Sequence, residues 1–293
     1  MEDSFNIANY RKTYQLPEEK VIHTAEFIPY KGFHLFFQMF KQPNEAELVL
    51  FLHGFFDHAG THSEWIHYLT DQGYHVAAFD LPGHGKSGGP SIKRESFQEY
   101  KEALSTVLTH LKKTERAIIH GIGHSTGGAV LADYLLSYDD TVLQKVALVS
   151  PLIRSNQWWL SKMAAPIIAV FQKELPRTFR VHTGEASFME SIKQDPLEGR
   201  TIPVSWIYAM FQWEKELMEK TPSFKPVQIL QGTEDQTLEW KHNMEAYHTL
   251  FPYSNRILID NGRHHLLNER KAQREMIYRL IVNFLKNKEN TAL

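Results

Sequence analysis

Short apolar segments recur along the chain, each ending in a glycine or a polar residue, and helical patterns lie between them. Nearly continuous apolar runs are typical of strands that are buried on both faces, as in a parallel sheet. Their alternation with helices predicts an α/β fold with a mostly parallel, doubly wound sheet. The predicted core strands are Leu48–His53, Val76–Asp80, Ala117–Gly121, Val146–Ser150, Val227–Gly232 and Arg256–Asp260. Two earlier segments, Val21–Phe27 and Phe33–Phe40, are expected to form an antiparallel pair at one edge.

A long insertion separates the predicted strands Val146–Ser150 and Val227–Gly232, because one crossover helix needs far fewer residues. It contains the tryptophans Trp158, Trp159, Trp206 and Trp213. Its second half, Pro203–Lys220, is predicted to be a helix, since a proline occupies the first turn and apolar residues recur at helical spacing. We therefore expect a core of residues 1–151 and 226–293, with residues 152–225 inserted over the sheet.

The sequence GHSTGG, residues 123–128, matches the pattern G-x-S-x-G and lies between a predicted strand and a predicted helix. In that context the pattern places a nucleophilic serine on a sharp strand-to-helix turn, and glycines allow the close packing that the turn requires. Ser125 is therefore the candidate nucleophile. The same stretch resembles a dinucleotide-binding turn, but its glycine spacing is one residue too long for that fingerprint.

A serine nucleophile of this kind needs an acid and a base later in the chain, in the order Ser, Asp or Glu, His. Asp235 follows the strand Val227–Gly232, and His264 follows the strand Arg256–Asp260. Functional residues of open α/β sheets gather at the carboxyl ends of the strands. The order and the placement together predict a Ser125–Asp235–His264 triad.

The sequence HGFFDH, residues 53–58, follows the first core strand. A hydrolase of this type takes one oxyanion donor from this loop and another from the residue after the nucleophile. The backbone N–H groups of Phe55 and Thr126 are the candidates, although HG can also simply close a tight turn.

The composition of the chain limits the kinds of site, partner and cofactor that it can have. The chain has no cysteine, which excludes disulfides, a thiol nucleophile and zinc sites built on thiolates. The formal net charge is -2, and no basic block suggests nucleic acid as a partner. The chain has 16 histidines, but none of the spacings typical of metal-binding motifs stands out. The pair His58 and His62, four residues apart, is a weak candidate for a metal site. We therefore expect that the protein binds neither a metal nor a cofactor. The N-terminus lacks the apolar core of a secretory signal, and a cytoplasmic protein is expected.

With these motifs in place, the chain resembles the monoacylglycerol lipase and lysophospholipase-like branch of the α/β-hydrolases. The resemblance rests on LHGFFDH, FDLPGHGKSGG, GHSTGG, the GTED turn and RHHLLNE, which span residues 52–269 in the family's order. It implies the α/β-hydrolase fold, with a helical lid inserted after the sixth strand. It also implies cofactor-free cleavage of carboxylic esters, often acylglycerols. By motif position it assigns Asp235 rather than Glu234, and His264 rather than His265.

The sequence departs from that family near the expected acyl pocket. Phe55 and Phe56 stand where smaller residues are common, and Thr126 replaces a frequent methionine. An apolar lid favours medium or long acyl chains, whereas the two phenylalanines favour short ones. Phe56, Trp158 and Trp206 are candidate substrate contacts, and the lid is a candidate for transient contact with a membrane or micelle.

Two other functions remain open at this level. An aminopeptidase of the proline-iminopeptidase kind has the same fold and triad, and it needs carboxylates in the lid to hold a free amine. Glu185, Glu190, Glu214 and Glu216 are the residues available for that purpose. A non-catalytic ligand-binding protein on the same fold is the second alternative. The oligomeric state is not evident from the sequence.

Overall fold

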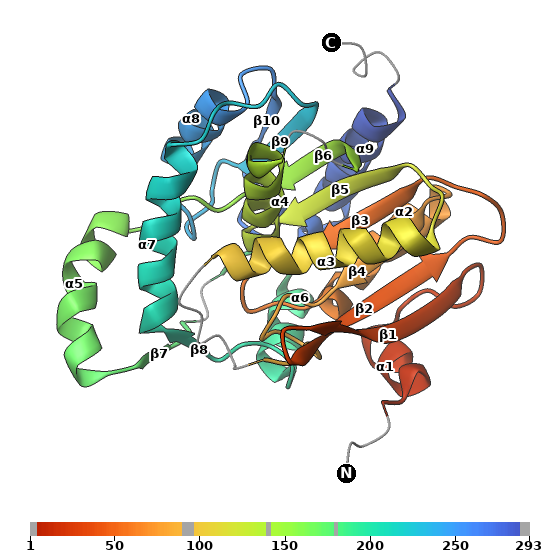
Figure 1. Ribbon diagram of the computed structural model, residues 1–293, viewed down its shortest axis with the longest axis horizontal. Helices are drawn as coiled ribbons and strands as arrows, with labels where there is room; N and C mark the ends of the chain where they lie inside the picture. The colour runs from red at the N-terminus through yellow and green to blue at the C-terminus, as the bar shows by residue number, and fades with distance from the viewer. Residues whose placement is uncertain (1–4, 90–96, 139–141, 179–180, 288–293) are drawn as a thin grey trace.

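A central eight-stranded sheet carries helices on both faces (Figure 1). The structure is a computed structural model that describes residues 5–89, 97–138, 142–178 and 181–287. Its sheet order is β1-β2-β4-β3-β5-β6-β9-β10. The strands from β4 to β10 in this order are parallel, while β1 pairs with β2 and β2 pairs with β4 in antiparallel fashion. The predicted α/β fold and its antiparallel edge pair are confirmed.

The strand bounds follow the apolar runs closely. The edge pair is β1 (Ile22–Tyr30) and β2 (Phe33–Lys41). The parallel strands are β3 (Leu48–Leu52), β4 (His75–Phe79), β5 (Ile119–His124), β6 (Leu143–Val149), β9 (Val227–Gly232) and β10 (Asn255–Ile259).

The strand β5 lies further along the chain than the predicted Ala117–Gly121 and continues to His124, directly before Ser125. Glycines and histidines weaken the strand pattern of this segment in the sequence. Pairing on both sides compensates, because Gly121 lies opposite Leu50 of β3 and Val146 of β6. The sheet therefore carries the backbone up to the candidate nucleophile.

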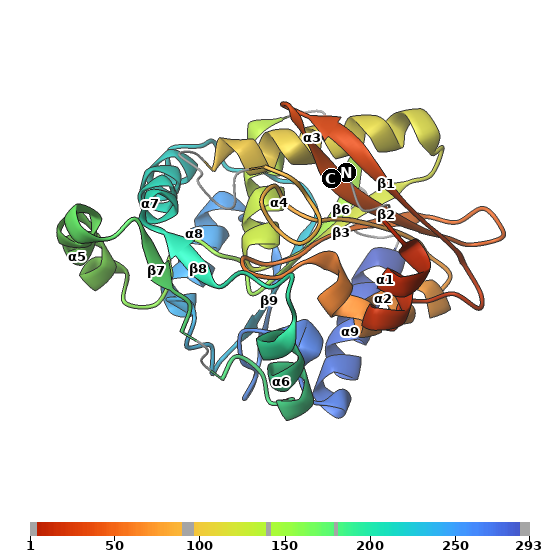
Figure 2. The same cartoon turned by 90° about the horizontal axis from the view of Figure 1, so that it is seen from below.

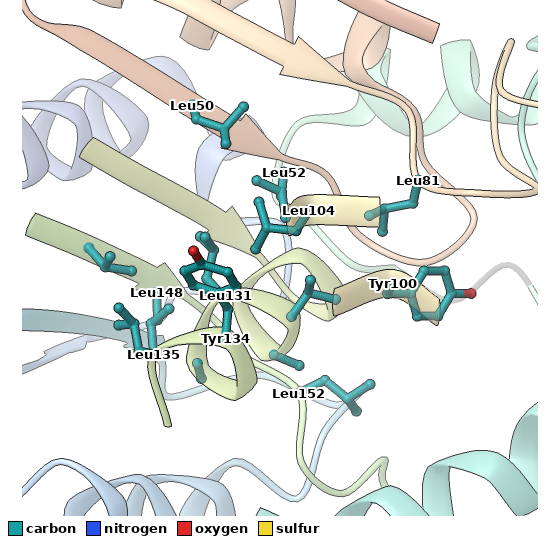
Figure 3. Packing of buried hydrophobic residues seen from close by; sticks show 14 of the residues in the cluster. Leu50, Leu52, Leu81, Tyr100, Leu104, Leu131, Tyr134, Leu135, Leu148 and Leu152 are labelled. Atoms are coloured by element: carbon teal, nitrogen blue, oxygen red, sulfur yellow. The ribbon is translucent and has the colours of Figure 1, made fainter. Parts of the chain in front are cut away.

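Two apolar layers hold the helices against the sheet. On one face lie α3 (Gln98–Thr114), α4 (Thr126–Ser137) and α8 (Trp240–Leu250). On the other lie α1 (Ile7–Tyr14), α2 (Ser63–Asp71) and α9 (Lys271–Lys286). Figure 3 shows the first layer, in which leucines of α3 and α4 meet leucines of β3 and β6.

The segment between β6 and β9 forms α5 (Trp158–Phe171), β7 (Glu174–Pro176), α6 (Ala186–Gln194), β8 (Thr201–Pro203) and α7 (Val204–Met218). The helix α7 lies within the predicted Pro203–Lys220, and the helix α5 lies outermost, at the far side of α7 from the sheet (Figures 1 and 2). No helix in the described ranges is long and apolar enough to span a bilayer.

A buried carboxylate fixes α7 to the core. Asp133 of α4 accepts a hydrogen bond from Trp213 Nε1 of α7 at 3.1 Å and one from Lys220 Nζ at 2.6 Å. Lys101 Nζ of α3 lies 3.3 Å from the same carboxylate. Because buried charges need paired partners, this network sets the position of α7 above the sheet.

Candidate active site

Ser125 occupies a tight turn between β5 and α4 and has a φ of 51°. Few residues other than glycine adopt this conformation, and such strain concentrates at functional sites. The turn depends on close packing of strand and helix. A Cβ atom on Gly123 would lie 2.5 Å from the Gly127 carbonyl carbon, and one on Gly127 would lie 2.4 Å from the Leu52 carbonyl oxygen. A larger residue at position 123 would push α4 away from β5, and one at position 127 would push α4 away from the end of β3.

The structure brings the three candidate catalytic residues together. Ser125 Oγ lies 3.0 Å from His264 Nε2, and His264 Nδ1 lies 2.9 Å from Asp235 Oδ2. Asp235 follows β9 and His264 follows β10, so both reach Ser125 from the carboxyl edge of the sheet. The spacing matches that of a nucleophile, a general base and the acid that orients the base.

The Asp235 carboxylate is held in its ionised form. Burial alone would raise its pKa, but the adjacent His264 and the hydrogen bonds it receives hold the pKa below its usual value. Its Oδ1 accepts from the N–H groups of Thr237 and Leu238, and its Oδ2 accepts from Gln231 Nε2 at 3.0 Å. An ionised carboxylate here favours the His264 tautomer whose Nε2 is free to take a proton from Ser125.

The neighbouring residues differ from Asp235 and His264 in their surroundings. Glu234 is exposed and lies 3.8 Å from Arg263 in an ion pair. His265 is buried against His124, with their ring centroids 4.7 Å apart. No hydrogen bond joins either residue to Ser125 in the described structure.

The two residues that carry the candidate oxyanion donors, Phe55 and Thr126, line the same pocket as Ser125. Thr126 is the first residue of α4. The first N–H groups of a helix have no partner within the helix, so this one is available to a developing negative charge. Phe55 follows β3, and its ring stacks on Trp206 of α7 with a centroid separation of 4.0 Å.

A pocket of about 350 Å³ opens above Ser125 and is also lined by His264. Its apolar lining residues are Phe55, Phe56, Leu152, Leu175, Pro176, Ile202, Trp206, Met210 and Leu238. Its polar lining residues besides the triad are His124, Thr126, Ser155, Asn156, Arg177, Thr178, His182, Thr237 and His265. None of the described residues that line this pocket is an aspartate or glutamate.

The candidate substrate contacts separate into two groups. Phe56 and Trp206 line the pocket, whereas Trp158 does not. Trp158 is fully buried at the start of α5, and its ring packs edge-on against Phe211 of α7. The structure therefore assigns Trp158 to the packing of α5 on α7.

Sequence reasoning missed two groups of residues at the site. Arg177 and His182 come from the insertion, where neither has a motif to mark it. Asp57, His124 and His265 form a buried cluster next to Ser125, and one ligand atom from each lies within 4.8 Å of the others. These residue types could hold a metal ion. Asp57 and His124 belong to recognised motifs, but the motifs do not show that the two meet.

Comparison with known proteins identifies the family. The family described as serine aminopeptidase, S33, matches residues 43–271. The chain belongs to this family. The predicted resemblance to the α/β-hydrolases and to their monoacylglycerol lipase-like branch is thereby confirmed, and the chain is a hydrolase by family.

Several curated proteins are similar over part of the chain. A phospholipase of Bacillus subtilis is 23% identical over 207 residues, which cover 68% of this chain and 80% of that protein. A monoacylglycerol lipase of Mycolicibacterium smegmatis is 30% identical over 131 residues, or 41% of this chain and 46% of the lipase. An acetyltransferase component of the acetoin cleaving system of Cupriavidus necator is 31% identical over 153 residues, and the match spans only 38% of its length.

Among solved structures, a soluble variant of monoglyceride lipase from Saccharomyces cerevisiae superimposes with a TM-score of 0.77. The match covers 91% of this chain and 97% of the yeast protein at 16% sequence identity. At that identity the likeness establishes the fold.

We expect the change Ser125→Ala to remove nearly all hydrolytic turnover, by a factor on the order of 10⁶, while the protein remains folded. Mass spectrometry after treatment with an organophosphate should find the adduct on Ser125. An adduct on Ser87 or Ser150, which are buried serines nearby in the sequence, would contradict the assignment.

Neighbouring residues provide matched controls for the acid and the base. Asp235→Asn should cripple turnover, because the amide cannot hold His264 in the productive tautomer, whereas Glu234→Gln should have a mild effect. His264→Ala should abolish turnover, and His265→Ala should retain a measurable rate. Steady-state kcat with a chromogenic ester checks both pairs, and reversed severity in either pair would show that the assignment is shifted by one residue.

Proposed function

We propose that the protein is a serine ester hydrolase that acts on monoacylglycerols or similar lipid monoesters through an acyl-enzyme on Ser125. The observation that carries this proposal is the Ser125–His264–Asp235 geometry at the base of a largely apolar pocket. The similarity to a phospholipase and to a monoacylglycerol lipase supports the same substrate class.

In the proposed mechanism, Ser125 Oγ attacks the ester carbonyl carbon while His264 Nε2 takes its proton. The N–H groups of Phe55 and Thr126 donate to the oxyanion, and each such donor contributes roughly 10²–10³ in turnover. The C–O bond to the alcohol breaks, and the alcohol leaves with the proton from His264. Water then gives its proton to His264 and attacks the acyl carbon, which releases the acid and restores Ser125.

The apolar wall of the pocket favours an acyl group as the bound part of the substrate. Pockets for small molecules range from about 300 to 1,000 Å³, and the volume of about 350 Å³ falls at the lower end. Each buried methylene contributes about 0.8 kcal/mol. Phe55 and Phe56 both line the wall, where the Phe55 ring packs against Trp206 and the Phe56 ring lies under the Arg177 guanidinium. This arrangement favours medium to long acyl chains over short ones.

The aminopeptidase alternative finds less support, although the family's description includes such enzymes. A free substrate amine needs a carboxylate in the pocket, and the described pocket wall has none. Glu214 is paired with Arg154 at 2.6 Å, and Glu185 accepts hydrogen bonds at the start of α6. Glu198, which is buried near Phe56, is paired with Arg177. These three carboxylates are therefore engaged outside the pocket, and the other two candidates, Glu190 and Glu216, accept hydrogen bonds from Gln194 and Gln212.

We also propose that residues 152–225 act as a lid that touches a membrane or micelle transiently. The outer helix α5 exposes an unusual number of large apolar side chains, namely Trp159, Leu160, Met163, Ile167, Val170 and Phe171. Exposed apolar patches of this kind mark interaction sites, and a helix with such a face can lie in a lipid interface. Contact there would bring lipid monoesters to the pocket.

Acyl-chain preference tests the substrate class. We expect kcat/KM for p-nitrophenyl esters or monoacylglycerols of two to sixteen carbons to rise toward eight carbons or more. A sharp maximum at two to four carbons would identify a short-chain carboxylesterase, and preference for amino-acid amides would identify an aminopeptidase. The change Met210→Phe, in the pocket wall, should shift the optimum to shorter chains. Met218→Phe, on the same helix but outside this pocket, is the control.

Two isoleucines of equal exposure test the membrane contact. Ile167 of α5 and Ile22 of β1 are 67% and 65% exposed. Ile167→Glu should reduce co-sedimentation with phosphatidylcholine vesicles and slow hydrolysis of vesicle-borne substrate, because a charge on the apolar face opposes its burial in lipid. Ile22→Glu should change neither. Equal effects of the two changes, or no effect of either, would contradict the contact.

A further inference from the structure

A buried histidine outside the triad holds the backbone of the candidate base. His124 is the last residue of β5, and its Nε2 lies 3.1 Å from the carbonyl oxygen of His264. A carbonyl oxygen only accepts hydrogen bonds, so His124 Nε2 must carry a proton and donate it. The residue before the nucleophile is thus bonded to the residue that is expected to activate it.

The other ring nitrogen of His124 faces a buried carboxylate. Asp57 Oδ2 lies 3.6 Å from His124 Nδ1 and 3.4 Å from His62 Nε2, and both histidines are buried with Asp57. His62 Nδ1 lies 3.3 Å from the Asn268 amide nitrogen, which donates and leaves the His62 proton on the nitrogen that faces Asp57. With its proton on Nε2, the His124 ring has none on Nδ1 to donate, and 3.6 Å is too long for a hydrogen bond. Asp57, which lies in the same loop as Phe55, is therefore next to the His124 ring without being hydrogen-bonded to it.

We propose that His124 is a positioning residue for the catalytic base: it donates a hydrogen bond from Nε2 to the His264 carbonyl, so that His264 Nε2 stays aligned with Ser125. This inference rests on the proposed role of His264 as general base.

The physical reason is the sensitivity of proton transfer to geometry. Displacement of a reacting group by about 1 Å can cost on the order of 10²-fold in rate. His264 lies in a loop after β10, outside regular secondary structure, and among the described residues its ring is hydrogen-bonded to Asp235 and Ser125 alone. The hydrogen bond from His124 holds the backbone from which that ring projects. His124 therefore acts on the rate of serine activation.

The test separates positioning from simple stability with three variants. Asp57→Leu and His124→Leu each leave a buried polar partner unmatched, so both should lower Tm. Asp57→Leu leaves the hydrogen bond between His124 and His264 in place, so it is the control for a loss of stability alone. His124→Gln is the conservative variant, because its amide can still donate to the His264 carbonyl. For each protein we would measure Tm, kcat and KM with an ester, and the rate at which a fluorophosphonate labels Ser125.

We expect kcat and the labelling rate to fall about 10²-fold in His124→Leu, with KM little changed. In Asp57→Leu both rates should stay within about tenfold of the wild type although Tm falls, and the same holds for His124→Gln. If the rates fall as far in Asp57→Leu as in His124→Leu, or if His124→Leu labels as fast as the wild type, the positioning role is overturned while the triad stands. A wild-type protein that neither labels at Ser125 nor hydrolyses esters overturns both this inference and the proposed function.

Discussion

The close approach of β5 and α4 around Ser125 is the constraint on which the rest of the site depends. The contact distances at Gly123 and Gly127 leave no room for side chains, and they allow Ser125 to take its positive φ at the very end of the strand. The same turn directs the first N–H groups of α4 toward the pocket. A serine elsewhere on the sheet would lack either access to the pocket or the N–H donors of a helix start. The chemistry of the site therefore follows from how closely β5 and α4 pack.

Three segments that are distant in sequence meet at this turn through side-chain contacts. The loop after β3 stacks Phe55 on Trp206, which belongs to the inserted helix α7. Farther along the same loop, Asp57 faces His124, and His124 is bonded to the backbone of His264. The proposed oxyanion donor, nucleophile and base are thus coupled to one another and to the insertion. Because the ring of Phe55 is in direct contact with Trp206 of α7, movement of α7 would displace Phe55 first.

The sequence predicted the parts of this site that depend on local pattern. Strands end where their apolar runs end, so the placement of Ser125, Asp235 and His264 at one sheet edge could be foreseen from their order alone. Contacts between segments that are distant in sequence could not be foreseen in this way. Trp158 and Trp206 both lie near the start of a helix of the insertion, yet Trp158 packs on Phe211 of α7 and Trp206 lines the pocket, because the rotation of each helix is set by tertiary packing. The limits of β5 were also misplaced, since pairing on both sides overrides the weak strand propensity of its glycines.

The most direct test of the account is the capture of an acyl group on Ser125 during turnover of an octanoyl ester. The enzyme would be mixed with a p-nitrophenyl octanoate, quenched in acid within milliseconds and digested for mass spectrometry. The account predicts an initial burst of p-nitrophenol close to one equivalent per enzyme when deacylation is slow, and an octanoyl adduct on the peptide that contains Ser125. Turnover without any adduct on Ser125, or with the acyl group on another residue, would contradict it.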